Sequence, residues 1–61
     1  MQDVSRIKVI ATKYALLNQL MDERMRRQWS AAEAVAYGWG GIQAVAEITG
    51  LSPTTIRKGQ R

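Results

Sequence analysis

Apolar side chains recur every three or four positions along the first third of the chain. Five of them share one face of a helix: Ile7, Ile10, Tyr14, Leu17 and Met21. We expect this helix over residues 3–19, with Asp3 as its N-cap. A second apolar stripe predicts that the helix is covered on more than one side: Val9, Leu16 and Leu20. Packing into the core is the preferred interpretation, and a homodimer contact is the alternative.

A second helix is expected over residues 22–37. A single helix running from the N-terminus to residue 37 would be about 50 Å long, which is too long for a chain of this size. Asp22 is a suitable N-cap, and the acid-first pairs Asp22 with Arg26 and Glu23 with Arg27 favour a helix after it. One face is expected to carry the apolar side chains Met25, Trp29, Ala32 and Ala36. The alanine-rich stretch WSAAEAVAY would let another helix approach closely.

Glycines separate the second helix from a third. In the stretch GWGG, Gly38 can end the second helix, and Gly40 and Gly41 can turn the chain. A short helix over residues 41–49 follows, because four side chains fall on one face of it: Ile42, Val45, Ala46 and Thr49. Polar Gln43 and Glu47 lie opposite that face.

The stretch GLSP predicts a tight turn into a last helix. Gly50 can end the third helix with a positive φ, and Leu51 can return to the core. Ser52 is a strong N-cap, and Pro53 suits the first position of a helix over residues 53–60. Two helices joined in this way form a helix-turn-helix. The expected fold is therefore all-α, a single three- to four-helix domain over residues 1–61 with a C-terminal helix-turn-helix.

The last helix carries the candidate DNA-binding residues. With Ile56 facing inward, the residues on and around its outer side are Ser52, Pro53, Thr54, Thr55, Arg57, Lys58 and Arg61. The second helix of such a motif lies in the major groove of double-stranded DNA. There Arg57 can bind guanine O6 and N7, and a Thr methyl group can contact thymine. Ser52 and the helix start suit a phosphate, as does Lys58.

Charge is distributed unevenly along the chain, whose formal net charge is +4. Residues 29–51 contain no Lys or Arg and two acids, Glu33 and Glu47. Six cations precede this segment: Arg6, Lys8, Lys13, Arg24, Arg26 and Arg27. Residues 52–61 add three cations and no acid. This distribution indicates a polyanionic partner, most simply nucleic acid, and a solvated basic surface is the alternative.

Composition excludes several classes of function. The chain has no Cys and no His, which excludes disulfides and the usual zinc sites. Its five acids are scattered, so we expect no catalytic residue, metal site, cofactor or small-molecule ligand. No apolar run approaches the ~18 residues of a membrane span, and the first residues lack a signal pattern. We therefore expect a cytoplasmic protein with no membrane partner.

Two stretches of the chain resemble the amino-terminal region of bacterial insertion-sequence transposases of the DDE type: MDERMRRQWSAAEA and YGWGGIQAVAEITGLSPTTIRKG. The resemblance covers residues 20–60 and leaves residues 1–19 without a matching motif. It implies binding to transposon ends, in a protein associated with the nucleoid when bound to DNA. In that family a separate RNase-H-like domain with three acids and divalent metal ions cuts DNA. We expect that domain to lie beyond residue 61.

Two alternatives stay open. Within the same class, the chain could be a small helix-turn-helix transcriptional regulator. From a different class, it could be a helical oligomerisation module with a seam formed by Tyr14, Leu17, Trp29 and Trp39. The choice between monomer and homodimer is open in both readings.

Overall fold

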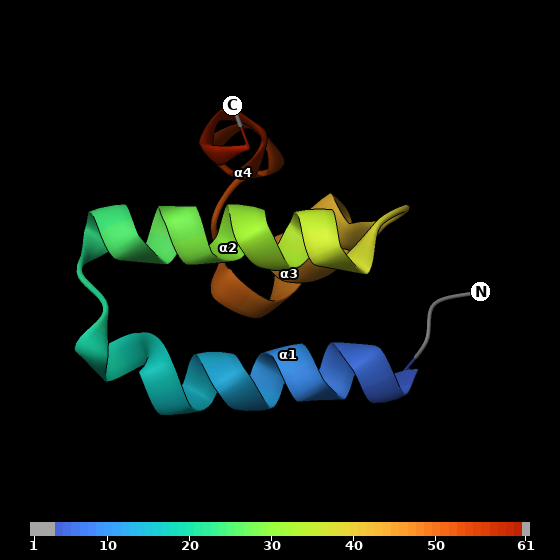
Figure 1. Ribbon diagram of the computed structural model, residues 1–61, viewed down its shortest axis with the longest axis horizontal. Helices are drawn as coiled ribbons and strands as arrows, with labels where there is room; N and C mark the ends of the chain where they lie inside the picture. Colours follow the sequence, from blue (N-terminus) through green and yellow to red (C-terminus); the bar gives the residue numbers. More distant parts are fainter. Residues whose placement is uncertain (1–3, 61) are drawn as a thin grey trace.

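The structure of the chain, a computed structural model, describes residues 4–60. Its elements, in chain order, are α1 (Val4–Leu17), the 3-10 helix η1 (Asn18–Leu20), α2 (Glu23–Tyr37), α3 (Gly41–Thr49) and α4 (Pro53–Gly59). All regular structure in this part of the chain is helical, which confirms the predicted all-α fold. Figure 1 shows α1 and α2 running antiparallel, with α3 behind them and α4 on the side of α2 away from α1. Within residues 4–60, no helix combines the length and the apolar character that crossing a bilayer requires.

The helices begin and end close to the predicted positions. The first helix tightens into η1 after Leu17 instead of continuing to residue 19, and its predicted cap Asp3 lies outside the described residues. The third helix has the predicted bounds. The last helix ends at Gly59, one residue early, because the N–H of Gln60 bonds to the carbonyl of Arg57 in the tighter 3-10 pattern.

One buried side chain from each α-helix meets at the centre of the molecule: Ile10, Ala34, Val45 and Ile56. Half-buried apolar side chains surround this centre: Trp29, Tyr37, Ile42, Ala46, Ile48 and Leu51. A chain of this length buries only about 60% of the surface of its unfolded state. Each fully buried side chain therefore carries a large share of the stability.

The buried face of α2 differs from the predicted one. Its buried residues are Ser30, Ala31 and Ala34, whereas Ala32 and Ala36 are exposed and Met25 is 49% exposed. Of the predicted stripe, only Trp29 packs against the core. The reason is that α3 and α4 both pack on α2, and two helices can approach a third closely only over small side chains.

The two apolar stripes of α1 have different environments. Ile10 is buried and Ile7, Tyr14 and Met21 are half-buried, so most of the first stripe packs as predicted; Leu17, at 36% exposed, lies at its edge. The second stripe is exposed: Val9, Leu16 and Leu20 are 55%, 72% and 75% exposed. The prediction that the chain itself covers this stripe is wrong. Within residues 4–60, the side of α1 that packs into the core is the one that carries Ile10.

Arg26 determines how the chain turns between α1 and α2. Its guanidinium donates to the side chain of Asn18 at 2.9 Å, and to the carbonyls of Asn18 and Met21 at 3.1 Å each. Asp22 caps α2 as predicted, because its carboxylate accepts a hydrogen bond from the N–H of Met25 at 2.8 Å. The predicted ion pair of Asp22 with Arg26 is therefore wrong, since each group is engaged with the backbone of the turn.

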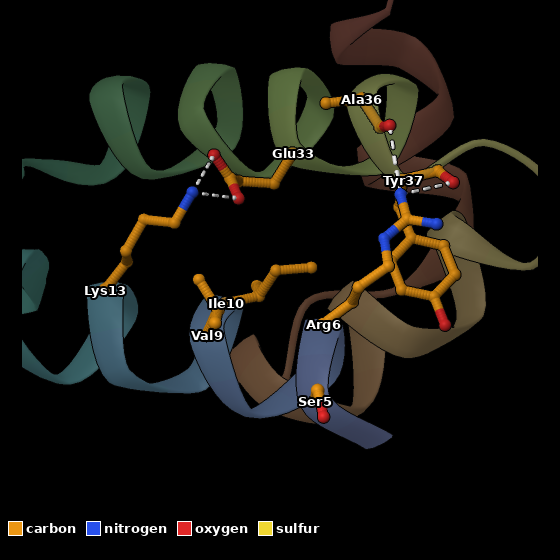
Figure 2. Close-up of a pocket in the computed structure, with 8 residues that line it drawn as sticks. All are labelled: Ser5, Arg6, Val9, Ile10, Lys13, Glu33, Ala36 and Tyr37. Atoms are coloured by element: carbon orange, nitrogen blue, oxygen red, sulfur yellow. Dashed lines mark hydrogen bonds and ion pairs between the residues drawn. The ribbon is translucent and has the colours of Figure 1, made fainter. Parts of the chain in front are cut away.

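Two further cations join α1 to α2, as Figure 2 shows. Arg6 donates to the carbonyls of Ala36 and Tyr37 at 3.3 and 2.9 Å, and its guanidinium lies 4.3 Å from the centre of the Tyr37 ring. It thereby satisfies carbonyls that the end of α2 leaves unpaired. Lys13 forms an ion pair with Glu33 at 3.0 Å. Arg6, Lys13 and Arg26 are thus used to build the fold.

The side chain of Ser30 is fully buried, and its hydroxyl has no hydrogen-bond partner within the described residues. A buried hydroxyl left unpaired costs about 1–3 kcal/mol. We expect Ser30→Ala to raise the free energy of unfolding by about 1 kcal/mol, because alanine fits the same space without a polar atom. In a domain of this size that corresponds to a rise of about 4–8 °C in Tm, measurable by circular dichroism.

The control for this variant is Ser52→Ala. The hydroxyl of Ser52 caps α4, so its removal should lower stability by about 1 kcal/mol. A lower melting temperature for Ser30→Ala would show that the hydroxyl of Ser30 has a stabilising partner.

Candidate nucleic-acid interface

A three-residue turn joins α3 to α4. Gly50 ends α3 in the left-handed region, at φ 78° and ψ 1°, and its N–H bonds to the carbonyl of Ala46 at 2.9 Å. Leu51 then packs against the core, and its N–H bonds to the hydroxyl of Thr49 at 3.2 Å. Ser52 accepts a hydrogen bond from the N–H of Thr55 at 3.1 Å, and Pro53 takes the first helical position. The predicted roles of Gly50, Leu51, Ser52 and Pro53 in this turn are confirmed.

The hydroxyl groups of Ser52 and Thr55 also bond to each other, at 2.9 Å. Only one of the two O–H groups can donate in this contact. The other O–H keeps its proton for a second acceptor.

One side of α4 faces inward and the other is open. Ile56 has no exposed surface, and it anchors α4 to the core. Five of the predicted site residues are exposed on and beside the outer side: Ser52, Pro53, Thr54, Arg57 and Lys58. Thr55 is half-buried, and Arg61 lies outside the described residues. Figure 1 shows that α4 projects from the bundle beyond α2, on the side away from α1.

Side chains of α2 lie beside α4, an arrangement that was not predicted. We call the groove between the two helices the basic groove; its volume is about 540 Å³. It is lined by Arg24, Arg27, Gln28, Thr55, Lys58 and Gly59. The spacing of Arg24, Arg27 and Gln28 by three and four residues shows that they share a helix face. The sequence alone gave no sign that this face meets α4.

Trp39 lies on the other flank of α4. It is 94% exposed, in the connection between α2 and α3, and shares a groove with Pro53 and Arg57. Gly38 and Gly40, on either side of it, have φ values of 88° and 81°. By contrast, Tyr14 and Trp29 pack against each other with ring centres 5.6 Å apart. The aromatic residues of the predicted oligomerisation seam therefore do not form one surface.

The cations around α4 are mostly unpaired. Arg24, Arg57 and Lys58 make no side-chain hydrogen bond or ion pair with any residue from 4 to 60. Arg27 pairs with Glu23 at 3.5 Å, as predicted, although the side chain of Glu23 is 81% exposed. An exposed pair of this kind contributes about 0–1 kcal/mol. The positive charge on this side of the molecule is therefore available to an anionic partner.

Within residues 4–60, no three His, Cys, Asp or Glu side chains come together as a metal site. Comparison with protein-family models, curated proteins and solved structures finds no match to this chain.

Proposed function

We propose that the protein binds double-stranded DNA in a sequence-specific manner, with α3, the turn and α4 acting as a helix-turn-helix. The observation that carries this proposal is the outer side of α4. It presents Thr54, Arg57 and Lys58 to solvent, while the buried Ile56 anchors the helix to the core from behind. A surface with unpaired cations and short hydroxyl side chains suits the edges of bases and the phosphates around them.

The dimensions of α4 also favour the major groove. Its seven residues span about 10 Å along the helix axis. A helix with side chains is about 10–12 Å wide, and the major groove of B-DNA is about 12 Å wide. The width of α4 is therefore compatible with the major groove.

We further propose that this is the DNA-binding part of a transposase, which recognises the ends of a mobile element in the bacterial cytoplasm. The support is the resemblance of residues 20–60 to insertion-sequence transposases of the DDE type. A small transcriptional regulator would use the same surface. The gene sequence beyond residue 61 separates the two proposals, because a transposase should continue into an RNase-H-like domain.

A different class of function, a helical oligomerisation module, is favoured by one observation. The stripe of Val9, Leu16 and Leu20 on α1 is exposed. Sedimentation equilibrium without DNA tests it: a dimer that Leu16→Glu dissociates would support oligomerisation through α1.

Selection of bound sites from random duplex DNA tests the main proposal. An enriched sequence would support sequence-specific binding, and its symmetry would report whether one copy or two bind. A salt titration with the selected duplex should give a negative log–log slope of about 0.9 per phosphate contact. If no duplex is bound at low salt, the proposed function is wrong.

Within the site, we expect Arg57→Ala to weaken binding to the selected duplex by about 1–3 kcal/mol and to relax the preference at one base pair. The physical reason is the loss of a guanidinium that can bond twice to guanine. Fluorescence anisotropy with the selected duplex and with single-base variants measures both effects. The matched control is Lys58→Ala, which should weaken all duplexes by a similar factor. Equal losses on every duplex for Arg57→Ala would contradict base recognition by Arg57.

A further inference from the structure

The basic groove places three cations from two helices around one space. Arg24 and Arg27 come from α2 and Lys58 from α4, and the lining contains no carboxylate. Arg24 and Lys58 have no partner within the described residues, and Arg27 has only the exposed carboxylate of Glu23 at 3.5 Å. Like charges gathered without a counterion repel one another, so an anion entering the groove would relieve an unfavourable interaction.

Close packing of α4 on α2 fixes the position of this groove. A Cβ added to Gly59 would lie 3.0 Å from the Cβ of Ala31 and 3.2 Å from the carbonyl oxygen of Arg27. The backbones therefore touch directly beside Arg27 and Lys58. The cations therefore extend from two helices that are in direct contact beside the groove.

We propose that the basic groove binds backbone phosphates of one DNA strand, at the edge of the major groove that α4 enters. This inference rests on the proposed function, and it adds α2 as a second DNA-contacting element. A helix that fills the major groove has phosphates along its flanks, where Arg24 and Arg27 lie beside α4. Guanidinium groups bond phosphate oxygens in pairs, which suits the two arginines. Such contacts orient the protein on the duplex and carry no sequence preference.

The test uses Arg24→Ala and Arg27→Ala in the 61-residue chain. Both should bind the selected duplex and an unrelated duplex more weakly by the same factor. At 0.1 M salt, counterion release alone makes one phosphate contact worth about eight-fold in affinity. The log–log salt slope of each variant should be less steep than that of the wild type by about 0.9. Circular dichroism checks that the variants are folded.

Three further variants complete the test. Lys8→Ala removes an exposed cation from α1, which lies on the side of α2 away from α4, and it should keep the wild-type slope. Glu23→Gln frees Arg27 from its carboxylate, and it should strengthen binding to every duplex. Glu47→Gln removes an exposed carboxylate that does not line the groove, and its effect should be smaller.

The outcomes separate this inference from the proposed function. Wild-type slopes for both arginine variants, in a protein that binds its selected duplex, would overturn the inference and leave the function standing. If the arginine variants lost affinity for the selected duplex and kept it for the unrelated duplex, the inference would also be overturned, because the groove would then recognise bases. If the wild type binds no duplex, the proposed function fails first and the inference fails with it.

Discussion

Ile56→Ala is expected to leave the protein largely unfolded at room temperature. Replacing a buried isoleucine by alanine costs about 2–5 kcal/mol, and the cost is highest where the surroundings cannot collapse into the cavity. Ile56 has no exposed surface and meets Ile10, Ala34 and Val45 at the centre of the core. A single core in a chain below about 70–80 residues rarely supplies more than 3–5 kcal/mol. The loss is therefore comparable to the whole stability.

Urea unfolding followed by circular dichroism measures this effect. Ile56→Val should lose only about 0.5–1.5 kcal/mol, since it removes one methylene group. Val35→Ala is the matched surface control, because Val35 is 63% exposed on α2, and it should change stability by about 0.5 kcal/mol or less. A wild-type unfolding midpoint for Ile56→Ala would contradict the packing of α4 described above.

Gly41→Val is the second variant expected to have a large effect. Gly41 is buried at the start of α3, and a Cβ there would collide with the carbonyl oxygen of Ala34 and lie 3.0 Å from the Cβ of Tyr37. Overpacking of a core costs about 1–3 kcal/mol, occasionally more. We expect the upper end of this range, because the obstacle is the backbone of α2 and cannot change rotamer.

The comparison for Gly41→Val is Gln43→Val, two residues later in the same helix. Gln43 is exposed, so this variant measures the helix propensity of valine without the collision. Thermal unfolding of the two variants should differ by more than 10 °C, because each kcal/mol shifts Tm by about 4–8 °C in a domain of this size. Equal melting temperatures would show that α3 can move away from α2 at little cost.

Most helix boundaries could be predicted from the sequence, because they depend on neighbouring residues. Asp22 bonds to an N–H three residues away, as does Ser52. Gly50 adopts the positive φ that its place after a helix requires. Gly41 begins α3 as predicted, but its need to be glycine arises from close contact with α2 and not from the turn. The role of Gly41 depends on the approach of α2, which the residues next to Gly41 in the sequence do not indicate.

The surfaces were harder to predict, because they depend on which helices meet. The alanine-rich stretch of α2 was expected to let another helix approach closely, and α3 and α4 both pack on α2. The predicted face was displaced, however, because the residues buried there are Ser30, Ala31 and Ala34. Arg6 was counted with the basic surface, yet it caps the end of α2 from 30 residues away. The candidate site was predicted on α4 alone. Arg24 and Arg27 are far from α4 in the sequence, and the packing of α2 against α4 brings them to the candidate site.

The contact between Gly59 and Ala31 determines how far apart the cations of the basic groove lie. The two positions share one small space, so the sum of their side-chain volumes sets the distance between α2 and α4. A methyl group added at either position would widen that distance and move Arg27 relative to Lys58. In the proposed complex, these two cations contact phosphates of one strand from two different helices. The distance between those contacts is therefore set by a glycine and an alanine, two residues that carry no charge.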